Sequence, residues 1–526
     1  MKNIKRKGGR SVALFETGKQ FPPEDSIQRL AKYSRMRKFF KGQQWEVYDR
    51  ARLLLKDSPQ RDQLDVLYIS INLPYILTLK PADLLVGDAP IYEAGKPDSS
   101  EEQKALNSYV EENDLNTLIY ESATSNGYRG DSFVKVRYGY RQDYSELIRL
   151  GLDVPEDVEM EPIIEHVNAS YVFPETSNGD VKKFKAVNIA QIEWVETRND
   201  EIPYLNIERH IPGYIIYERY RLITRPEVGV DNTYGYPITL YTIGDKVATG
   251  RDEDIVETGL SHIPVFHIPY SSVDDDWQGD GFIEKIEKAL QAIEDRIAQL
   301  DYILMKHSDP TLYGPDLEGV GNSVSFGGKY IPITKEDATP GAITWDGQLD
   351  YVFKEINFLV SYIFQMSETP QWLFGTTMAD GDSGGTGTSH TDGAAIKARF
   401  MPILSKVRRI RNHYDKGIRD ALYTCSLFDK EFGSFEGEAF YPKIVWKDGI
   451  PKNEKEEAEI MQIRTAGKST LDVQSAIKRQ DEVDDDKAKE IMSRIEDDET
   501  AAMGTVDSSI FNQEPATTPT QEEATK

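Results

Sequence analysis

The chain has 526 residues, of which 89 are acidic and 62 basic, and its formal net charge is -27. One hydrophobic core does not usually organise a chain of this length, so about two to four structural units are expected. The acidic balance excludes a chain-wide attraction to nucleic-acid phosphates, and the one cysteine, Cys425, excludes an intrachain disulfide and a cysteine-rich metal site.

The chain begins with a basic segment, MKNIKRKGGR. No apolar stretch of the signal-peptide type follows it, and no run of about 18 apolar residues occurs, so neither conventional secretion nor a membrane-spanning helix is expected. The segment could steer the chain toward nucleic acid or toward the acidic surface of a partner, although short charged ends are more often solvated.

The first half of the sequence combines helices with strands. Residues 24–56 have helical apolar spacing with one break at Gly42, which predicts two short helices around a turn. Residues 101–130 predict a helical stretch that runs into a strand at 131–140. The Arg-Gly-Asp triplet at 129–131 is a weak cell-adhesion signal, and the neighbouring glycines favour a turn there instead.

Residues 165–270 consist of short runs rich in tyrosine and β-branched residues, separated by turn residues. This pattern predicts an antiparallel, β-rich part of an α+β domain. The polar, glycine-punctuated sequence SSVDDDWQGDG follows, and it indicates a domain boundary near 271–280.

Two helices with heptad spacing follow this boundary. Apolar residues recur at alternating steps of three and four through 280–306, which predicts a rod about 40 Å long. Pro310 and Pro315 end the rod, and a small turn-rich lobe is expected before a second seam of the same spacing at 349–368. The spacing by itself also fits an ordinary helical hairpin in a core.

The C-terminal third is predicted to be helical. A third apolar stripe runs through 394–428, and Pro402 is expected to kink this helix or to reset its start. Residues 453–497 predict short, highly charged helices, with Asn453 and Ser469 as N-caps. The sequence after them is low in apolar residues, which is typical of disorder.

The loop DGDSGGTGTSHTD contains GDSGG, the string around the nucleophilic serine of trypsin-like proteases. A nucleophile at Ser383 would need a histidine base, an orienting aspartate and an oxyanion hole, normally on paired β-barrels. Predicted helices flank the loop instead, and none of the seven histidines lies in the sequence context of that family's base. We expect no hydrolase here, and labelling of Ser383 by a fluorophosphonate would contradict this expectation.

Metal binding by the same loop is not expected either. His390 has no second histidine or cysteine nearby, so a solvated loop residue is the simpler interpretation. Asp380, Asp382 and Asp392 lack the spacing and the terminal glutamate of an EF-hand loop. The sequence therefore predicts no enzyme, no metal site and no cofactor.

The order of these parts resembles the portal proteins of tailed bacteriophages over residues 25–500. That order is a long helix, a small lobe, a returning helix, the segment TPQWLFG, a glycine-rich polar loop and another long helix. The segments FFKGQQW and YILTLKPADLLVGDAP are also similar to the entry segments of that family. The resemblance rests on the arrangement of parts, because no single motif is diagnostic.

The resemblance implies an α+β, portal-type fold with a mixed α/β wing, a two-helix stem, a small α/β clip, a long kinked spine helix and an α-helical crown. The implied segments are an N-terminal arm and wing at 1–270, a first stem helix at 271–306, a clip at 307–348, a second stem helix and turn at 349–375, a tunnel loop at 376–393, a spine helix at 394–430, a crown at 431–500 and a disordered tail at 501–526.

The implied tunnel loop would lie at the narrow point of a DNA channel. Glycine, serine and threonine let such a loop reshape as DNA slides, and the absence of lysine and arginine from it would keep its hold on phosphates weak. The implied channel residues are Thr376, Asp380, Ser383, Thr386, Thr388, Ser389 and His390 in the loop, with Lys285, Lys288, Arg296 and Lys306 on the first stem helix. These four basic residues could equally pair with Glu284, Glu287 and Glu294 at helical spacing.

The function implied by the resemblance is a virion protein, assembled in the host cytoplasm as a ring of about twelve copies at one capsid vertex. The ring would be the channel for DNA packaging and ejection and the head-tail connector. Its implied partners are other copies of itself, double-stranded DNA without sequence specificity, the terminase large subunit, major capsid and scaffolding proteins and a head-completion or adaptor protein, with no membrane. A different class stays open, a virion scaffolding or interaction protein that oligomerises through the helical hairpin and encloses no DNA.

Overall fold

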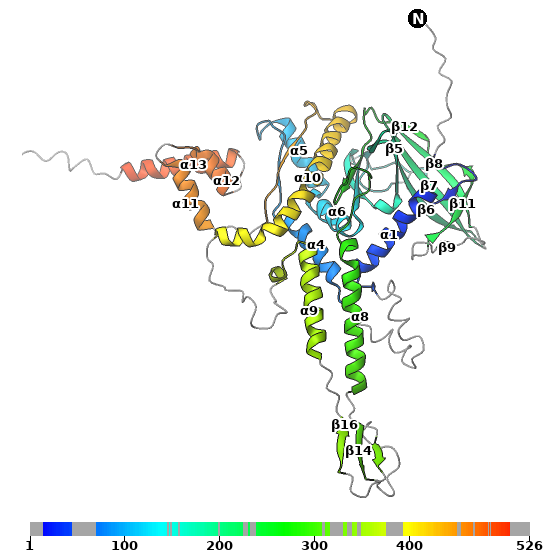
Figure 1. Cartoon of the computed structure of the whole chain (residues 1–526). Helices are drawn as coiled ribbons and strands as arrows, with labels where there is room; N and C mark the ends of the chain where they lie inside the picture. The colour runs from blue at the N-terminus through cyan, green and yellow to red at the C-terminus, as the bar shows by residue number, and fades with distance from the viewer. Residues whose placement is uncertain are drawn as a thin grey trace, which may run out of the picture. The chain divides into compact units, whose positions relative to one another are not determined.

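The structure, a computed structural model, describes residues 14–44, 70–144, 147, 150–155, 158–197, 200–224, 230–231, 238–307, 311–315, 330–333, 339–343, 349–374, 393–449, 454–466, 469–481, 483 and 485–504. Its contacts divide the chain into two units, one of residues 1–95 and 101–450, the other of residues 96–100 and 451–526. The first unit combines helices with several mostly antiparallel sheets (Figure 1). The predicted α+β class is therefore confirmed.

In the described N-terminal residues the helices are α1 (Glu24–Phe40), α4 (Leu73–Val86), α5 (Glu101–Glu112) and α6 (Leu115–Arg129). The side chain of Asn72 caps α4 by accepting the N–H of Tyr75 at 3.3 Å. Gly130 ends α6 at a φ of +95°, a conformation that favours glycine. The first helix predicted within 24–56 is confirmed up to Phe40, whereas the second lies outside the described residues.

A three-stranded antiparallel sheet follows α6, with β3 (Asp131–Gly139) between β4 (Glu161–Val167) and β13 (Val265–Pro269). Val134 and Val136 of β3 are fully buried, and their side chains belong to the main core. The strand predicted at 131–140 is confirmed. A short pair, β2 (Ile91–Glu93) with β17 (Lys443–Val445), lies elsewhere in this unit.

A larger sheet contains the strands β5 (Val172–Ser177), β6 (Asp180–Glu196), β7 (Glu201–Ile211), β8 (Tyr214–Thr224), β11 (Tyr241–Val247) and β1 (Gln20–Phe21), and β12 (Ile255–Glu257) also pairs with β8. The short helix η2 (Ala169–Tyr171) connects β4 to β5, and β9 (Val230–Asp231) pairs with β10 (Ile238–Thr239). The sheet is curled (Figure 1), and Phe15, Phe21 and Phe173 pack together on one face. The antiparallel β-rich region predicted for 165–270 is confirmed.

Two long helices follow, α8 (Ile283–His307) and α9 (Leu349–Met366). Between them in sequence lies a three-stranded sheet, in which β14 (Thr311–Pro315) pairs in parallel with β15 (Tyr330–Ile333) and antiparallel with β16 (Gly341–Ile343). The two heptad patterns thus predicted helices correctly, and short strands lie between them in sequence, as expected. That they form a separate lobe stays a prediction.

The longest helix, α10 (Gly393–Phe432), passes through the main core, where Tyr414, Ile418 and Leu422 are fully buried. It begins well before Pro402, so that proline does not reset the helix start. Figure 1 shows that α10 bends along its length, as expected for a helix that contains a proline. The short helix η3 (Gln371–Phe374) precedes the undescribed segment before α10.

The second unit contains α11 (Glu454–Thr465), α12 (Val473–Gln480) and α13 (Asp485–Gly504). The predicted cap at Ser469 is wrong, because the side chain of Asp472 accepts the N–H of Ser475 at 2.8 Å and α12 starts after it. The predicted cap Asn453 lies outside the described residues. Helix α13 continues to Gly504, beyond the start of the tail predicted at 501, and the rest of that tail is not described. None of the helices described in either unit is long and apolar enough to cross a membrane.

Candidate functional site

The hairpin of α8 and α9 begins and ends in the main core. Ile286, Leu290 and Ile293 of α8 are buried with Val360 and Ile363 of α9 in one cluster. Farther along the pair, Nε of Arg296 donates to both carboxylate oxygens of Glu355 at 3.0 Å. Leu304, near the end of α8, is 49% exposed. The base of the hairpin is therefore fixed in the core, and its far half is open to solvent.

The outer face of α9 carries large aromatic side chains that are exposed to solvent. Tyr351 and Phe358 are each 69% exposed and Tyr362 is 42% exposed. Steps of seven and four residues place these three on one face of a helix, because 3.6 residues make a turn. By the same spacing, the buried residues Val360 and Ile363 lie on the opposite face. Helix α9 is therefore apolar on two faces, of which the protein covers one.

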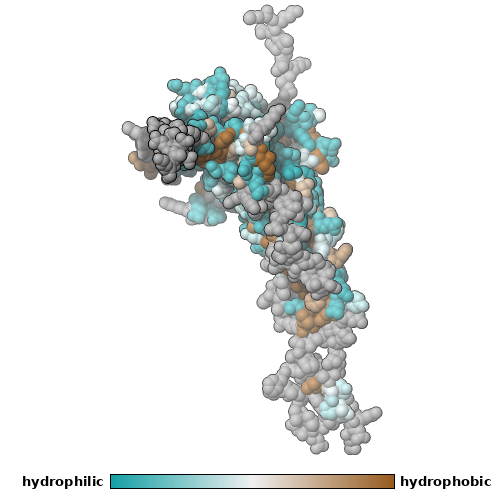
Figure 2. Space-filling view, turned by 90° about the vertical axis from the view of Figure 1, so that its left-hand side faces the viewer, coloured by the Kyte–Doolittle hydropathy of each residue, from teal (hydrophilic) through white to brown (hydrophobic). Residues whose placement is uncertain are grey.

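Figure 2 views the molecule from the side on which α9 lies in Figure 1, and hydrophobic surface is visible there among polar surface along the two helices. Exposed apolar patches of this kind usually mark a surface that another molecule covers. We call Tyr351, Phe358 and Tyr362 the α9 stripe.

The four basic residues singled out on α8 behave differently from one another. Lys285 and Lys288 are exposed and form no ion pair among the described residues. Arg296 is engaged by Glu355, and the side chain of Lys306 lies outside the described part of the chain. Among the described residues, two of the four thus have no ion-pair partner, and Arg296 pairs with α9.

The acidic residues of α8 pair with another helix. Glu284 lies 2.6 Å from Nζ of Lys32, and Glu287 pairs with Arg35, both on α1. Ser70 donates to the buried Glu294 at 3.4 Å. Glu284 and Glu287 therefore pair with α1, which lies against α8, and not with the basic residues of their own helix as expected.

All residues singled out in the glycine-rich loop lie outside the described residues. These are Thr376, Asp380, Ser383, Thr386, Thr388, Ser389 and His390. The described flanks are η3 and α10, where the ring of Trp372 packs edge-on against that of Phe400, with the ring centres 4.9 Å apart. The roles assigned to Ser383 and to the loop stay predictions. In the part of the chain that is described, no group of three or more histidine, cysteine, aspartate or glutamate side chains is placed to hold a metal ion.

A buried lysine joins α10 to the end of α9. Nζ of Lys406 donates to the backbone oxygen of Ser367 at 2.9 Å and lies 4.4 Å from the centre of the Phe282 ring. Burial lowers the pKa of Lys406 to about 7. The next residue after Ser367, Glu368, accepts two bonds of 2.6 Å from Arg409. Helix α10 therefore holds the C-terminal end of α9 through two basic side chains.

A buried carboxylate fixes the approach to α8. Asp131, which is 1% exposed, accepts hydrogen bonds from Tyr33 at 2.5 Å and from the backbone of Gly279 at 2.7 Å, and its other contact is His267 at 2.7 Å. We call this group the Asp131 corner. Arg129 is buried as well, so the Arg-Gly-Asp triplet is not displayed for adhesion, and the predicted turn at Gly130 is confirmed.

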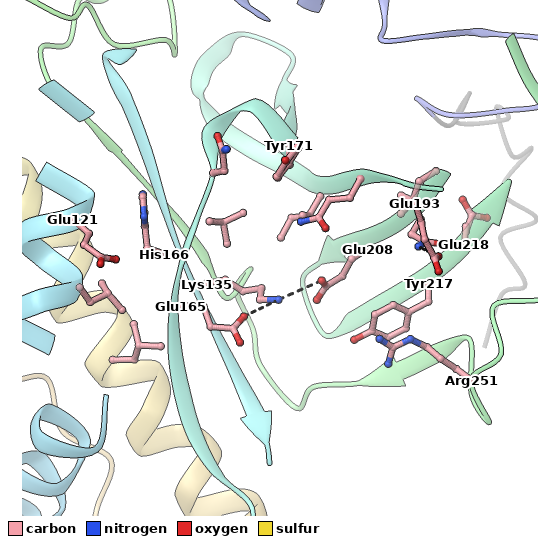
Figure 3. Close-up of a pocket in the computed structure, with 18 of the residues that line it drawn as sticks. Glu121, Lys135, Glu165, His166, Tyr171, Glu193, Glu208, Tyr217, Glu218 and Arg251 are labelled. Atoms are coloured by element: carbon pink, nitrogen blue, oxygen red, sulfur yellow. Dashed lines mark hydrogen bonds and ion pairs between the residues drawn. The ribbon is translucent and has the colours of Figure 1, made fainter. Parts of the chain in front are cut away.

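A separate cavity of about 1200 Å³ lies between α6, β4 and the curled sheet (Figure 3). The side chain of Lys135 extends into it, and its Nζ lies 3.1 Å from a carboxylate oxygen of Glu165 and 3.3 Å from one of Glu208. Burial alone would raise the pKa of Glu208, but the His210 ring and the charge of Lys135 outweigh burial and lower it to about 2. Burial lowers the pKa of His166, on the opposite wall, to about 4. At neutral pH the cavity therefore holds ionised carboxylates and a neutral histidine.

Sequence reasoning missed both the α9 stripe and the cavity. The stripe had a visible signal, since Tyr351, Phe358 and Tyr362 recur at helical spacing outside the heptad seam. The cavity had a weaker one, Lys135 within an otherwise buried strand.

No protein-family model and no curated protein matches this chain.

Proposed function

We propose that the chain is a ring-forming subunit that encloses a passage for double-stranded DNA, as portal proteins of tailed bacteriophages do. The α9 stripe is the observation that carries the proposal. Burying a large apolar side chain contributes about 1.5–3 kcal/mol, so each stripe repeated around an assembly would stabilise it by several kcal/mol. A face that binds a different face of the next copy generates a ring when the rotation closes.

The order of elements supports the same proposal. A helix, a small β lobe and a returning helix are followed by a glycine-rich segment and the long α10. In the portal-type arrangement these would be the stem, the clip, the tunnel loop and the spine of the wing, and the second unit would be the crown. The open Lys285 and Lys288 would add weak positive charge along the stem, which suits DNA that must slide.

In this role the protein is not an enzyme. It would dock the terminase motor through the β14–β16 lobe, and the motor would supply the energy for packaging. Capsid, scaffolding and head-completion proteins would contact the wing and crown at one vertex of the virion. These partners follow from the resemblance to portal proteins and are proposed on that basis.

The first test is the assembly state of the purified full-length chain. Light scattering is expected to give the mass of about twelve chains, and negative-stain micrographs are expected to show rings with a central hole. A monomer or dimer would refute the proposal. Large particles without a hole would instead favour the scaffolding protein that oligomerises through its helical hairpin.

The second test asks whether the α9 stripe makes the contact. The double variant Phe358→Ser and Tyr362→Ser is expected to reduce the mass to that of monomers or small oligomers while the far-ultraviolet circular dichroism stays unchanged. Trp194→Ser is a matched control, because Trp194 is a 51% exposed aromatic residue on β6. Rings that persist in the double variant would remove the stripe from the proposed interface.

The third test concerns the predicted tunnel loop. Deleting residues 376–393 is expected to leave the ring intact and to abolish packaging or retention of DNA in an assembled particle. Loss of the ring itself would show that the segment holds the subunits together.

A further inference from the structure

Among the described residues, the lining of the cavity in Figure 3 has more acidic than basic side chains. Its titratable lining comprises the acidic residues Asp114, Glu121, Glu165, Glu193, Glu208 and Glu218, the basic residues Lys135, Arg219 and Arg251, and His166. Figure 3 shows Glu121 and His166 on one side and Glu193 and Glu218 on the other, with Lys135 between them. Such an opening attracts cations and repels phosphates.

All three cations of the lining are already engaged. Lys135 is held by its two carboxylates. Arg219 contacts Glu193 at 3.1 Å, and the guanidinium of Arg251 lies 3.8 Å from the centre of the Tyr217 ring. Asp114 and Glu121, in contrast, are exposed and have no ion-pair partner among the described residues. The opening therefore offers two carboxylates to a cation from outside.

A strand edge is open in the same cavity. The side chain of Asn113 covers part of the β4 edge, because it accepts the N–H of Ile164 at 2.9 Å and donates to the oxygen of Pro162 at 3.3 Å. Alternation along the strand puts the backbone N–H and C=O of His166 on this same edge, away from β3. No other described segment bonds to them, and Nε2 of His166 is buried without a hydrogen bond.

Open backbone groups at a sheet edge pair with an extended peptide, and buried polar groups without partners are rare in a complete site. The two observations together describe the occupant. It is an extended segment that adds to the β4 edge at His166 and carries positive side chains toward Asp114 and Glu121.

The chain itself contains a segment of this chemistry. Its first ten residues, MKNIKRKGGR, include five lysines and arginines and no acid. The basic run at 406–411 is engaged elsewhere, because Lys406 bonds to Ser367, Arg409 to Glu368 and Arg411 to Asp448. Thirteen residues precede Leu14, and an extended segment of that length reaches about 45 Å.

We propose that this basic N-terminal segment binds in the β4 cavity, in the same chain or in a neighbouring copy, as an added strand held by Asp114 and Glu121. The proposal concerns a different surface from the α9 stripe and does not depend on the ring. Where copies are assembled, an arm that crosses from one copy to the next would tie subunits together at a second place.

Zero-length carbodiimide cross-linking of the full-length protein, followed by mass spectrometry, tests the proposal. Cross-links are expected from Lys2, Lys5 or Lys7 to Asp114 or Glu121. Mixing chains labelled with ¹⁵N and ¹⁴N separates the two sources, since cross-linked peptides of mixed label come from neighbouring copies. Cross-links spread evenly over exposed acids, with no preference for the cavity, would overturn the proposal.

A binding measurement provides the matched control. The host is the full chain with Lys5→Glu, Arg6→Glu and Lys7→Glu, so that its own segment does not compete, and the probe is a fluorescent peptide of residues 1–13. Adding Asp114→Asn and Glu121→Gln is expected to weaken binding about tenfold, since two exposed ion pairs are lost. The pair Asp274→Asn and Asp275→Asn, exposed acids outside the cavity, is expected to change nothing. If the host with Asp114→Asn and Glu121→Gln binds the peptide as tightly as the host without these two substitutions, the site is refuted, whatever the mass of the assembly.

Discussion

The substitution Gly130→Ala tests how closely the Asp131 corner is packed. A Cβ at this position would lie 2.7 Å from the backbone nitrogen of Gly281 and closer still to the backbone oxygen of Gly279. Both neighbours are backbone atoms, so no side chain can turn aside. The left-handed conformation costs an alanine about 1–2 kcal/mol, and forcing a methyl group into a packed site costs about 1–3 kcal/mol more. The free energy of unfolding is therefore expected to fall by about 2–5 kcal/mol.

Gly250→Ala separates the two contributions. Gly250 has a φ of +79°, but a Cβ there would meet no atom within 4 Å. Gly250→Ala therefore has only the cost of the left-handed backbone conformation, so its free energy of unfolding should fall by about 1–2 kcal/mol. Urea unfolding followed by tryptophan fluorescence at one protein concentration gives both values. Equal losses in the two variants would show that the approach of the 279–281 backbone to Gly130 adds nothing, and would refute the argument from packing.

Three further predictions concern buried charges. The pKa of Lys406 in the folded protein is about 7, below the usual value near 10.5. Between these two pH values the unfolded chain binds more protons than the folded one. The free energy of unfolding therefore rises with pH there, by up to about 1.4 kcal/mol per pH unit. Lys406→Met should abolish that rise, and a parallel pH dependence in urea titrations would contradict the assignment. Lys135→Met leaves two carboxylates without their shared cation and should cost about 3 kcal/mol at pH 7, whereas Lys246→Met, at an exposed pair with Glu218, should cost less than about 1 kcal/mol. Because the pKa of Glu208 is lowered to about 2, the ionised Glu208 stabilises the folded protein fully above its unfolded pKa of 4.5, and this stabilisation is lost as the pH falls toward about 2. The difference in free energy of unfolding between the wild type and Lys135→Met should therefore shrink across that range. A constant difference would refute the pairing.

Patterns that depend on neighbours in sequence predicted the fold well. The heptad seams correctly placed α8 and α9, and the alternation in β3 correctly indicated a strand. The predicted seam of α9 consists of Val352, Ile356, Leu359, Ile363 and Met366. It was less accurate at its end, since Met366 is exposed and Phe364 is buried instead. The reason is that burial near the end of α9 depends on the segments that pack there, such as η3, whose Phe374 ring centre lies 5.6 Å from that of Phe364. Spacing within one helix carries no information about them.

Features that depend on distant segments were not predictable from local pattern. Glu284 and Glu287 pair with α1 because that helix lies alongside α8, although residues of their own helix stood at suitable spacing. The N-cap of α12 is Asp472 and not the predicted Ser469, because α12 begins at Val473. The β4 cavity combines residues from α6, β4 and the curled sheet, so no single window of sequence contains it.

The Asp131 corner has a consequence for the order in which the chain folds. Its carboxylate joins Tyr33, His267 and Gly279, which lie 98, 136 and 148 residues away in sequence. Contacts of such separation close large loops and form after local helices and hairpins, so this carboxylate is expected to gain its partners late. Until then the chain that leads into α8 has no fixed starting direction. The base of the hairpin should therefore form only after α9 has been made and Gly279 has docked against Asp131.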